Sequence, residues 1–293
     1  MSVPASDTTM QPLKLVECPR DAMQGIREFI GTDRKAAYIN TLLQVGFDTI
    51  DFGSFVSPKA IPQMRDTADV LDKLELDNTE TKLLAIVANL RGAVDASAFE
   101  QIDYLGYPFS VSETFQIRNT NASMHESLDR LEAIQALCAK KNKKLVVYLS
   151  MGFGNPYGDP WNVGIVQGWV DKLADMGIRI MALSDTIGVS TPESISYLFE
   201  NLIPPYPDVE FGAHLHTLPD TWREKIEAAY NSGCRRFDSA MRGYGGCPMA
   251  KDDLTGNMPT ERLMEYFSDL EVLTDIDYDR FRESYESAGG IFI

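Results

Sequence analysis

The amino-acid sequence predicts a TIM (β/α)8 barrel, an α/β fold of eight alternating strands and helices, on three observations. Short runs rich in β-branched residues alternate with stretches of helical period along the whole chain. Eight strand candidates, each followed by a helix candidate, fill 293 residues, a typical length for such a barrel. No linker rich in Pro, Gly or Ser divides the chain. A doubly wound sheet is the alternative, but no G-x-G-x-x-G sequence follows the first strand candidate to favour it.

Each element candidate rests on a local pattern. The strand candidates contain apolar runs such as KLLAIVA, and the helix candidates carry apolar residues three and four apart. Gly46, Gly177 and Gly233 each lie shortly before a strand candidate, where a glycine commonly ends a helix. The strand candidates are 13–19, 49–54, 82–88, 104–112, 144–151, 179–186, 209–217 and 235–243. The helix candidates are 35–46, 62–74, 93–101, 124–142, 162–176, 192–203, 221–233 and 259–269.

The same pattern divides the chain into a short leader and one domain. We expect residues 1–12 to be a disordered leader. Residues 13–293 should form a single TIM-barrel catalytic domain with a C-terminal helical tail.

Composition and charge narrow the classes of function. The chain has a net charge of −16 and a pI of about 4.6. Such a surface repels nucleic acid and anionic membranes, which are bound through clustered Lys and Arg. The four cysteines are widely spaced without a C-x-x-C pattern, which argues against a disulfide framework. The N-terminus lacks the features of a signal peptide and no apolar run reaches membrane-spanning length, so we expect a soluble cytoplasmic protein.

Unusual polar residues lie at the ends of the strand candidates. In a TIM barrel the catalytic groups lie at the carboxyl ends of the strands, where the loops meet at one mouth. We therefore expect these residues to come together. They are Arg20 and Asp21 after the first strand candidate, Asp51 and Ser54 in the second, Asp185 in the sixth, His214 and His216 in the seventh, and Cys247 after the eighth.

The segment AHLHT carries the strongest local signal. Residues two apart in a strand project from the same face, so His214 and His216 should point together. Two neutral imidazoles side by side are natural ligands of a divalent metal; two buried, hydrogen-bonded histidines are the alternative. Asp21 is the anionic candidate ligand, and Asn257 is equally well explained as an amide ligand or as a turn residue. This donor set suits Mg²⁺ or Mn²⁺ better than Zn²⁺, because no thiolate is included.

Arg20 and Cys247 each allow two interpretations. Arg20 either pairs with Asp51 or Asp185 at the mouth, or presents its guanidinium to a substrate oxygen and stabilises the negative charge of an enolate. Cys247 follows closely spaced glycines, where a buried apolar role is hard to place. An unperturbed thiol has a pKa of about 8.5, so at neutral pH it is mostly protonated and can act as an acid.

Five segments occur in a characteristic order along the chain: VECPRDAMQG (16–25), DFGSFVSPKAIPQM (51–64), SDTIGVSTP (184–192), HLH (214–216) and GGCP…GN (245–257). Together they resemble the 3-hydroxy-3-methylglutaryl-CoA lyase family, a branch of the DRE-TIM metallolyases. The resemblance runs from about Leu13 to about Leu263. It implies a metal-dependent retro-Claisen cleavage of 3-hydroxy-3-methylglutaryl-CoA to acetyl-CoA and acetoacetate.

The resemblance also implies roles for individual residues. It implies an acyl-CoA substrate, Mg²⁺ or Mn²⁺ as the cofactor, and a homodimer. The implied metal ligands are Asp21, His214, His216 and Asn257. The implied catalytic residues are Arg20 for the enolate, Cys247 for proton transfer, and the carboxylates Asp185 and Asp51. The implied substrate-binding residues are Arg20, Gln24, Ser54 and Thr186.

Three residues depart from what this family usually carries. Asp51 stands in place of a glutamate, Thr217 in place of an aspartate, and Ala182 in place of a substrate-contacting serine. Because Thr217 carries no carboxylate, the hydrogen-bond partner that orients the imidazoles has to be another group. We expect the same reaction type, on the standard substrate or on a bulkier 3-hydroxy-3-alkylglutaryl thioester.

Three other functions are alternatives. A Claisen-condensing acyltransferase of the isopropylmalate or homocitrate synthase type shares the Arg-Asp and His-x-His pattern, but the segments SFVSPK and GGCP favour the lyase branch. An aldolase acting on 4-hydroxy-2-oxo acids would need no CoA. A non-catalytic scaffold would leave the cluster of candidate metal ligands unexplained.

Overall fold

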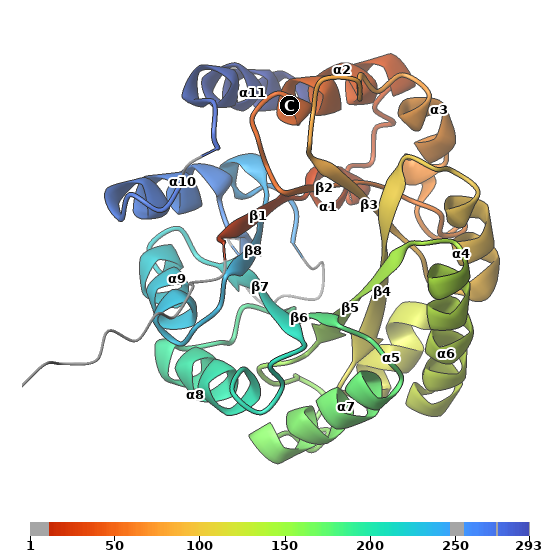
Figure 1. The fold of residues 1–293 in the computed structure, drawn as a ribbon, viewed down its shortest axis with the longest axis vertical. Coiled ribbons are helices and arrows are strands. Elements are labelled where there is room, and N and C mark those ends of the chain that lie inside the picture. Colours follow the sequence, from red (N-terminus) through yellow and green to blue (C-terminus); the bar gives the residue numbers. More distant parts are fainter. Residues whose placement is uncertain (1–11, 247–254, 274, 293) are drawn as a thin grey trace, which may run out of the picture.

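The computed structural model describes residues 12–246, 255–273 and 275–292, and it confirms the predicted TIM barrel (Figure 1). Eight parallel strands pair in the order β6-β5-β4-β3-β2-β1-β8-β7, and pairing of β6 with β7 closes the barrel. Every predicted strand is present, with ends that shift by a few residues. The strands are β1 (Lys14–Glu17), β2 (Thr49–Ser54), β3 (Lys82–Ile86), β4 (Ile102–Ser110), β5 (Lys144–Ser150), β6 (Ile180–Asp185), β7 (Glu210–Thr217) and β8 (Arg236–Ser239).

Helices surround the barrel as a ring (Figure 1). The α-helices are α1 (Pro19–Gln24), α2 (Thr32–Leu43), α3 (Thr67–Leu71), α4 (Leu90–Ser97), α5 (Glu113–Thr120), α6 (Met124–Lys140), α7 (Val163–Asp175), α8 (Pro192–Leu202), α9 (Trp222–Asn231), α10 (Thr260–Asp269) and α11 (Tyr278–Ile291). Two 3-10 helices, η1 (Pro62–Met64) and η2 (Met241–Gly243), complete the set in the described part of the chain. None of the helices described is both long and apolar enough to span a bilayer.

The helices differ from the predicted ones in two places. The candidate at 62–74 is divided into η1 and α3, because the Thr67 hydroxyl bonds to the backbone of Ser54 and of Met64 instead of facing solvent. Helices α1 and α5 lie inside loops of the predicted fold and are too short for helical periodicity to reveal them. The predicted leader falls almost entirely outside the described residues, whereas α11 forms within the predicted helical tail.

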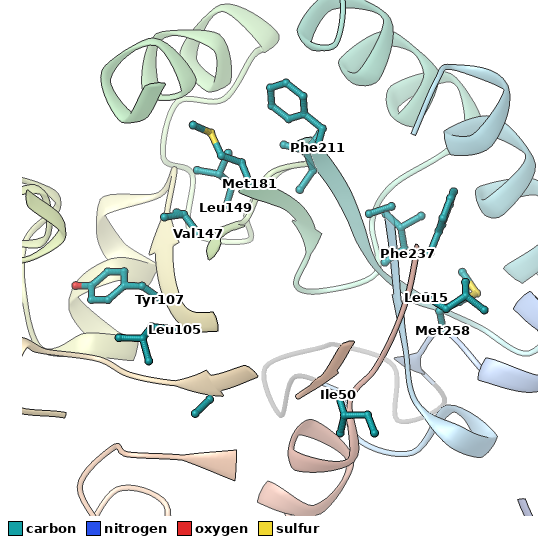
Figure 2. Close-up of a cluster of buried hydrophobic side chains, with 14 of the residues drawn as sticks. Leu15, Ile50, Leu105, Tyr107, Val147, Leu149, Met181, Phe211, Phe237 and Met258 are labelled. Atoms are coloured by element: carbon teal, nitrogen blue, oxygen red, sulfur yellow. The ribbon is translucent and has the colours of Figure 1, made fainter. Parts of the chain in front are cut away.

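Apolar side chains of the strands form two separate clusters. Alternate residues such as Leu105, Val147 and Leu149 point outward to the helices, as Figure 2 shows. The other set of alternating residues fills the barrel interior under its mouth: Leu84, Ile86, Tyr104, Val146, Tyr148, Ile180 and Ala182. The interior is therefore packed with side chains, and the cavity that holds the candidate site residues opens at its carboxyl end.

A ninth strand, β9 (Gly256–Asn257), brings the end of the loop after β8 onto the mouth. It pairs antiparallel with β7, with His216 opposite Asn257. Gly245 makes this close approach possible, because a Cβ there would lie 2.8 Å from the Asp21 carbonyl oxygen and 2.8 Å from Asn257 Nδ2. Gly245 also has a φ of +85°, which side chains other than glycine adopt rarely.

Glu17 connects β1 to the two elements that follow β8. It is fully buried, and its carboxyl group accepts hydrogen bonds from Met241 N at 2.9 Å and Thr260 Oγ1 at 2.5 Å. Burial raises the pKa of Glu17 from about 4.5 to about 8, although both hydrogen bonds lower it.

Glu17→Gln should therefore change how stability depends on pH. A raised folded-state pKa favours folding while the carboxyl group is protonated, and this contribution is lost as pH rises from about 4.5 to about 8. The free energy of unfolding of Glu17→Gln, relative to the parent chain, should increase by about 2 kcal/mol or more between pH 5 and pH 8. Urea unfolding at the two pH values measures this, and a difference that is independent of pH would contradict it.

Candidate active site

Three of the predicted site residues lie on α1, the short helix that follows β1. Pro19 at the first helical position starts the helix directly after the strand, which places Arg20 and Asp21 at the mouth. Gln24, one turn after Arg20, lies on the same face. Arg20 Nη1 donates to Asp21 Oδ1 and to Gln24 Oε1, both at 3.0 Å, and Gln24 Nε2 donates to Asp21 Oδ1 at 2.5 Å. These three side chains form one hydrogen-bonded group.

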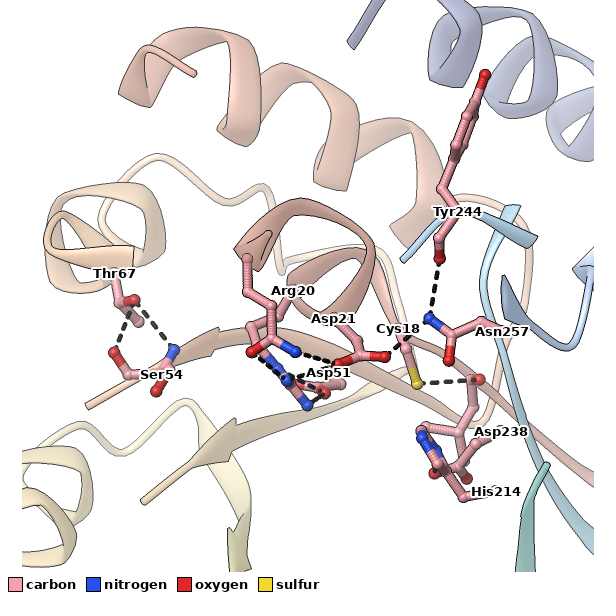
Figure 3. A network of polar contacts seen from close by, with 12 residues as sticks. Cys18, Arg20, Asp21, Asp51, Ser54, Thr67, His214, Asp238, Tyr244 and Asn257 are labelled. Atoms are coloured by element: carbon pink, nitrogen blue, oxygen red, sulfur yellow. Dashed lines mark hydrogen bonds and ion pairs between the residues drawn. The ribbon is translucent and has the colours of Figure 1, made fainter. Parts of the chain in front are cut away.

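Arg20 is held from the other side by Asp51 on β2. Arg20 Nε donates to Asp51 Oδ1 at 3.2 Å and to Oδ2 at 3.0 Å, and Nη2 also donates to Oδ2. The short side chain of Asp51 therefore reaches the guanidinium. Burial raises the pKa of Asp51 to about 6 against the opposing charge of Arg20, so the pair is ionised at neutral pH. Of the two roles open to Arg20, pairing with Asp51 is present, and Figure 3 shows the contact.

Asp21, His214 and His216 meet at one point of the mouth. Each offers a ligand atom, and these atoms all lie within 4.8 Å of one another. Burial would raise the pKa of Asp21, but the charges of Arg20 and then of the two imidazoles outweigh it and lower that pKa. Asp21 is thus ionised, and it lies beside two imidazole rings whose nitrogen atoms can also bind a metal ion.

His214 is oriented by a carboxylate that the predictions did not include. Its Nδ1 lies 3.1 Å from Oδ2 of Asp238 on β8. The other ring nitrogen, Nε2, is therefore the one left to bind a metal ion. Burial would lower the pKa of His214, but the hydrogen bond and the charge of Asp238 raise it. Asp238 takes the place expected for a carboxylate behind a metal-ligating histidine. Thr217 does not, because its hydroxyl contacts Leu218 O and Thr221 Oγ1, both at 2.9 Å.

His216 has the environment of a neutral ligand. Both ring nitrogens are buried and neither has a side-chain partner among the described residues; the backbone of Thr186 is the group that acts on the ring as a hydrogen-bond partner. Burial and the nearby charge of His214 lower the pKa of His216 to about 4, so the ring is neutral at pH 7. A buried imidazole nitrogen without a partner is costly unless something binds it. The residues present therefore fit a divalent cation bound by Asp21, His214 and His216.

Asn257 completes the group through the pairing of β9 with β7. Its Nδ2 donates to Asp21 Oδ2 at 2.7 Å and to Tyr244 O at 2.8 Å (Figure 3). Because the amide nitrogen makes both of these bonds, the amide oxygen is the atom that would serve as a ligand. Asn257 is thus hydrogen-bonded to a residue of the candidate metal site and is not only a turn residue.

A second group, Cys18, His214 and Asp238, also meets the distance criterion of 4.8 Å. Burial, followed by the charge of Asp238, raises the pKa of the Cys18 thiol well above its usual value. A protonated thiol is a poor metal ligand. The group formed by Asp21, His214 and His216 is therefore the better candidate.

The candidate metal site opens into a cavity of about 220 Å³ at the carboxyl ends of the strands. A larger cavity of about 850 Å³ lies near the opposite ends, beside Lys14 and Lys82, far from these groups. Chemistry in this fold occurs at the carboxyl ends, which favours the smaller cavity. Its polar lining includes Arg20, Asp21, Gln24, Asn119, Thr120, Tyr148, Ser150, Ser184, Thr186, His214 and His216, and its apolar lining Val56, Ile61, Ile86, Ala88, Pro108 and Phe115.

The remaining predicted residues differ in whether they line this cavity. Thr186 lines it, and its hydroxyl accepts from Met151 N at 2.8 Å. Ser54 is buried, and its hydroxyl accepts from Val56 N at 3.2 Å. Asp185 does not line the cavity and is bonded to groups behind its wall. Cys247 lies outside the described residues, although Gly246, which precedes it, lines the cavity.

Sequence reasoning missed Asp238, Tyr148 and Lys225. Asp238 lies inside a strand candidate, where a carboxylate is itself a signal. Tyr148 on β5 lines the cavity and packs its ring at 5.5 Å from that of His214. Lys225 lies next to Ile226 on the buried side of α9, where a cation is unusual.

The fold and this site together define a TIM-barrel enzyme with a candidate divalent-metal centre at its mouth. The HMGL-like family model matches residues 14–287, and the chain belongs to that family of lyases. The cytoplasmic 3-hydroxy-3-methylglutaryl-CoA lyase of Rattus norvegicus is 33% identical over 276 residues, covering 93% of this chain and 79% of the relative.

Two further relatives bear on the substrate. A 3-hydroxy-3-isohexenylglutaryl-CoA/hydroxy-methylglutaryl-CoA lyase of Pseudomonas aeruginosa is 32% identical, covering 90% of this chain and 88% of that protein. The structure of an HMG-CoA lyase from Acinetobacter baumannii, in complex with coenzyme A and 3-methylmalate, is also similar. It superposes with a TM-score of 0.88 at 28% identity, covering 96% of this chain and 91% of that one.

His216→Ala should abolish tight binding of Mn²⁺ or Mg²⁺ and lose turnover with it. Loss of a direct ligand should exceed the roughly 10- to 100-fold cost of losing a residue behind a ligand. His125→Ala is the matched control, since His125 is an exposed histidine at the start of α6. Titration calorimetry with Mn²⁺ measures the affinity, and an unchanged affinity in His216→Ala would contradict the assignment.

Proposed function

We propose that this chain is a metal-dependent carbon–carbon lyase that cleaves 3-hydroxy-3-methylglutaryl-CoA, or a related 3-hydroxy-3-alkylglutaryl-CoA, by retro-Claisen chemistry. The products are acetyl-CoA and acetoacetate, or the corresponding 3-oxo acid. The observation that carries the proposal is the meeting of Asp21, His214 and His216 beside Arg20 in one cavity. Membership of the HMGL-like family supports the reaction type.

The residues of the mouth have separate tasks in this reaction. Asp21, His214, His216 and Asn257 would hold Mg²⁺ or Mn²⁺. When bound, the cation supplies Lewis acidity toward the oxygen atoms of the substrate. Arg20, held in place by Asp51, directs its positive charge toward the cavity and stabilises negative charge on the thioester oxygen. Gln24 and Thr186 line the same cavity and are positioned to bind the acyl group.

The bond cleavage needs one proton transfer before it and one after it. The tertiary hydroxyl gives its proton to water in the cavity, and the bond between C2 and C3 then breaks, leaving a carbonyl at C3 and an enolate of acetyl-CoA. The enolate carbon must gain a proton, and Cys247 is our candidate donor, because a thiol is a competent acid near neutral pH. Its neighbour Gly246 lines the cavity, which supports this role.

The proposal leaves one feature of the substrate to be determined, the size of the alkyl group at C3. An apolar wall of Val56, Ile61 and Phe115 borders the cavity. The Pseudomonas aeruginosa relative is named for both an isohexenyl and a methyl substrate. These features support testing substrates with a longer apolar chain alongside 3-hydroxy-3-methylglutaryl-CoA.

The proposed function predicts release of acetyl-CoA and a 3-oxo acid from the glutaryl thioester, dependent on Mg²⁺ or Mn²⁺ and lost in a chelator. Coupled assays for both products measure it, with the methyl and longer 3-alkyl substrates compared side by side. Release of free CoA from acetyl-CoA and 2-oxo acids without cleavage would instead identify a condensing acyltransferase. Cleavage of 4-hydroxy-2-oxo acids without CoA would identify an aldolase.

Cys247→Ser should bind metal and substrate normally but turn over more slowly by orders of magnitude, because a hydroxyl is a far weaker acid than a thiol. The kcat and the Mn²⁺ affinity are measured on the same preparation. A normal kcat in Cys247→Ser would remove this residue from the proton transfer.

A further inference from the structure

The two candidate metal-binding histidines are oriented in different ways. The ring of His214 is fixed by Asp238 through Nδ1. The ring of His216 has no such side-chain partner among the described residues, and the polar group that acts on it as a hydrogen-bond partner is the backbone of Thr186. A ligating imidazole must nevertheless be oriented before the metal binds, or the ordering weakens the binding. The orientation of His216 therefore depends on main-chain groups, those of its own residue and that of Thr186.

Lys225 on α9 contacts that main chain directly. Its Nζ donates to the carbonyl oxygen of His216 at 2.8 Å and to Asp185 Oδ2 at 2.9 Å. The side chain of Lys225 is 4% exposed and that of Asp185 is fully buried. A buried lysine is rare and requires this kind of pairing, so the contact is a specific feature of this mouth.

Asp185 connects Lys225 to the loop after β6. Its Oδ1 accepts from Val189 N at 2.8 Å, and its Oδ2 accepts from Ser190 N at 3.1 Å and Ser190 Oγ at 2.5 Å. With Lys225, four donors occupy the carboxylate. Thr186, the residue after Asp185, lines the cavity. The Lys225–Asp185 pair thus joins the strand of the metal-binding histidines to the loop that forms one wall of the cavity.

We propose that Lys225 is a positioning residue for His216: by holding the His216 carbonyl oxygen against the Asp185 loop, it directs the imidazole toward Asp21 and His214. This inference rests on the proposed metal site. It also gives Asp185 a different role from the one implied by the resemblance: Asp185 holds Lys225 in place and does not act on the substrate. Lys225 does for His216, through the main chain, what Asp238 does for His214 through the ring.

The test is Lys225→Met, which keeps the length of the side chain and removes its charge and donors. The dissociation constant for Mn²⁺, measured by titration calorimetry on the full chain, should rise about 10- to 100-fold. The Mn²⁺ concentration for half-maximal turnover should rise in parallel, with kcat at saturating Mn²⁺ affected less. Circular dichroism of the metal-free protein establishes that the variant is folded.

Lys35→Met is a matched control. Lys35 is also buried, and its Nζ also donates to one carboxylate, Asp66 Oδ1 at 2.6 Å, and to one main-chain carbonyl, that of Gln63. Its loss should lower thermal stability in the same way as the loss of Lys225. It should change the Mn²⁺ dissociation constant by less than about twofold, because Lys35 holds no candidate ligand.

The outcomes separate this inference from the proposed function. If the parent chain binds Mn²⁺ and folded Lys225→Met binds it equally well, the role of Lys225 is overturned while the metal site stands. If the parent chain binds no Mn²⁺, the metal site fails and this inference fails with it. If Lys225→Met does not fold, Lys225→Gln replaces it, since the shorter neutral side chain cannot span both partners, and parent-like Mn²⁺ affinity in that variant overturns the inference.

Discussion

The buried carboxylate of Asp21 is the constraint on which the mouth of this barrel depends. Three side-chain donors converge on it, from Arg20 and Gln24 on α1 and from Asn257 on β9, far apart in the sequence. A buried anion must be hydrogen-bonded and paired, and this requirement brings the beginning and the end of the barrel together at one point. The pairing of β9 with β7 then places His216 beside the same carboxylate.

The charge of the mouth favours a bound divalent cation. Two buried carboxylates, Asp21 and Asp51, contact a single guanidinium, that of Arg20. The charge of Asp238 acts on Arg236 of the same strand, which is also paired with Glu210 at 3.2 Å. Negative charge in excess of the fixed cations is costly in a buried site, and a divalent ion would offset it. The overall charge of −16 gives this chain no general attraction for anions, so a thioester enolate depends on Arg20 and the cation.

The sequence predicts the barrel and the groups of its mouth because both follow from local rules. Period-two and helical patterns identify the strands, and parallel strands place residues such as Asp51 and His214 at one edge. Orientation is not a local property. The carboxylate of Asp185 lies at a strand end as expected, yet it bonds to Lys225, which is 40 residues away. Strands β7 and β8 are neighbours in any such barrel, but the order of motifs does not specify that the carboxylate of Asp238 points at Nδ1 of His214.

The two histidines show why a His-x-His pattern alone does not define a metal site. A strand places both rings on one face, but it leaves each ring free to rotate about its side-chain bonds. In this chain the ring of His214 is restrained by Asp238, and the main chain of His216 is held on two sides, by Lys225 and by its pairing with Asn257. Because Asn257 also bonds to Tyr244 O, the same contacts hold the segment that leads to Gly246 at the cavity. The candidate metal site and the segment from Tyr244 to Gly246 therefore depend on the same contacts, so a change that loosens β7 would disturb both.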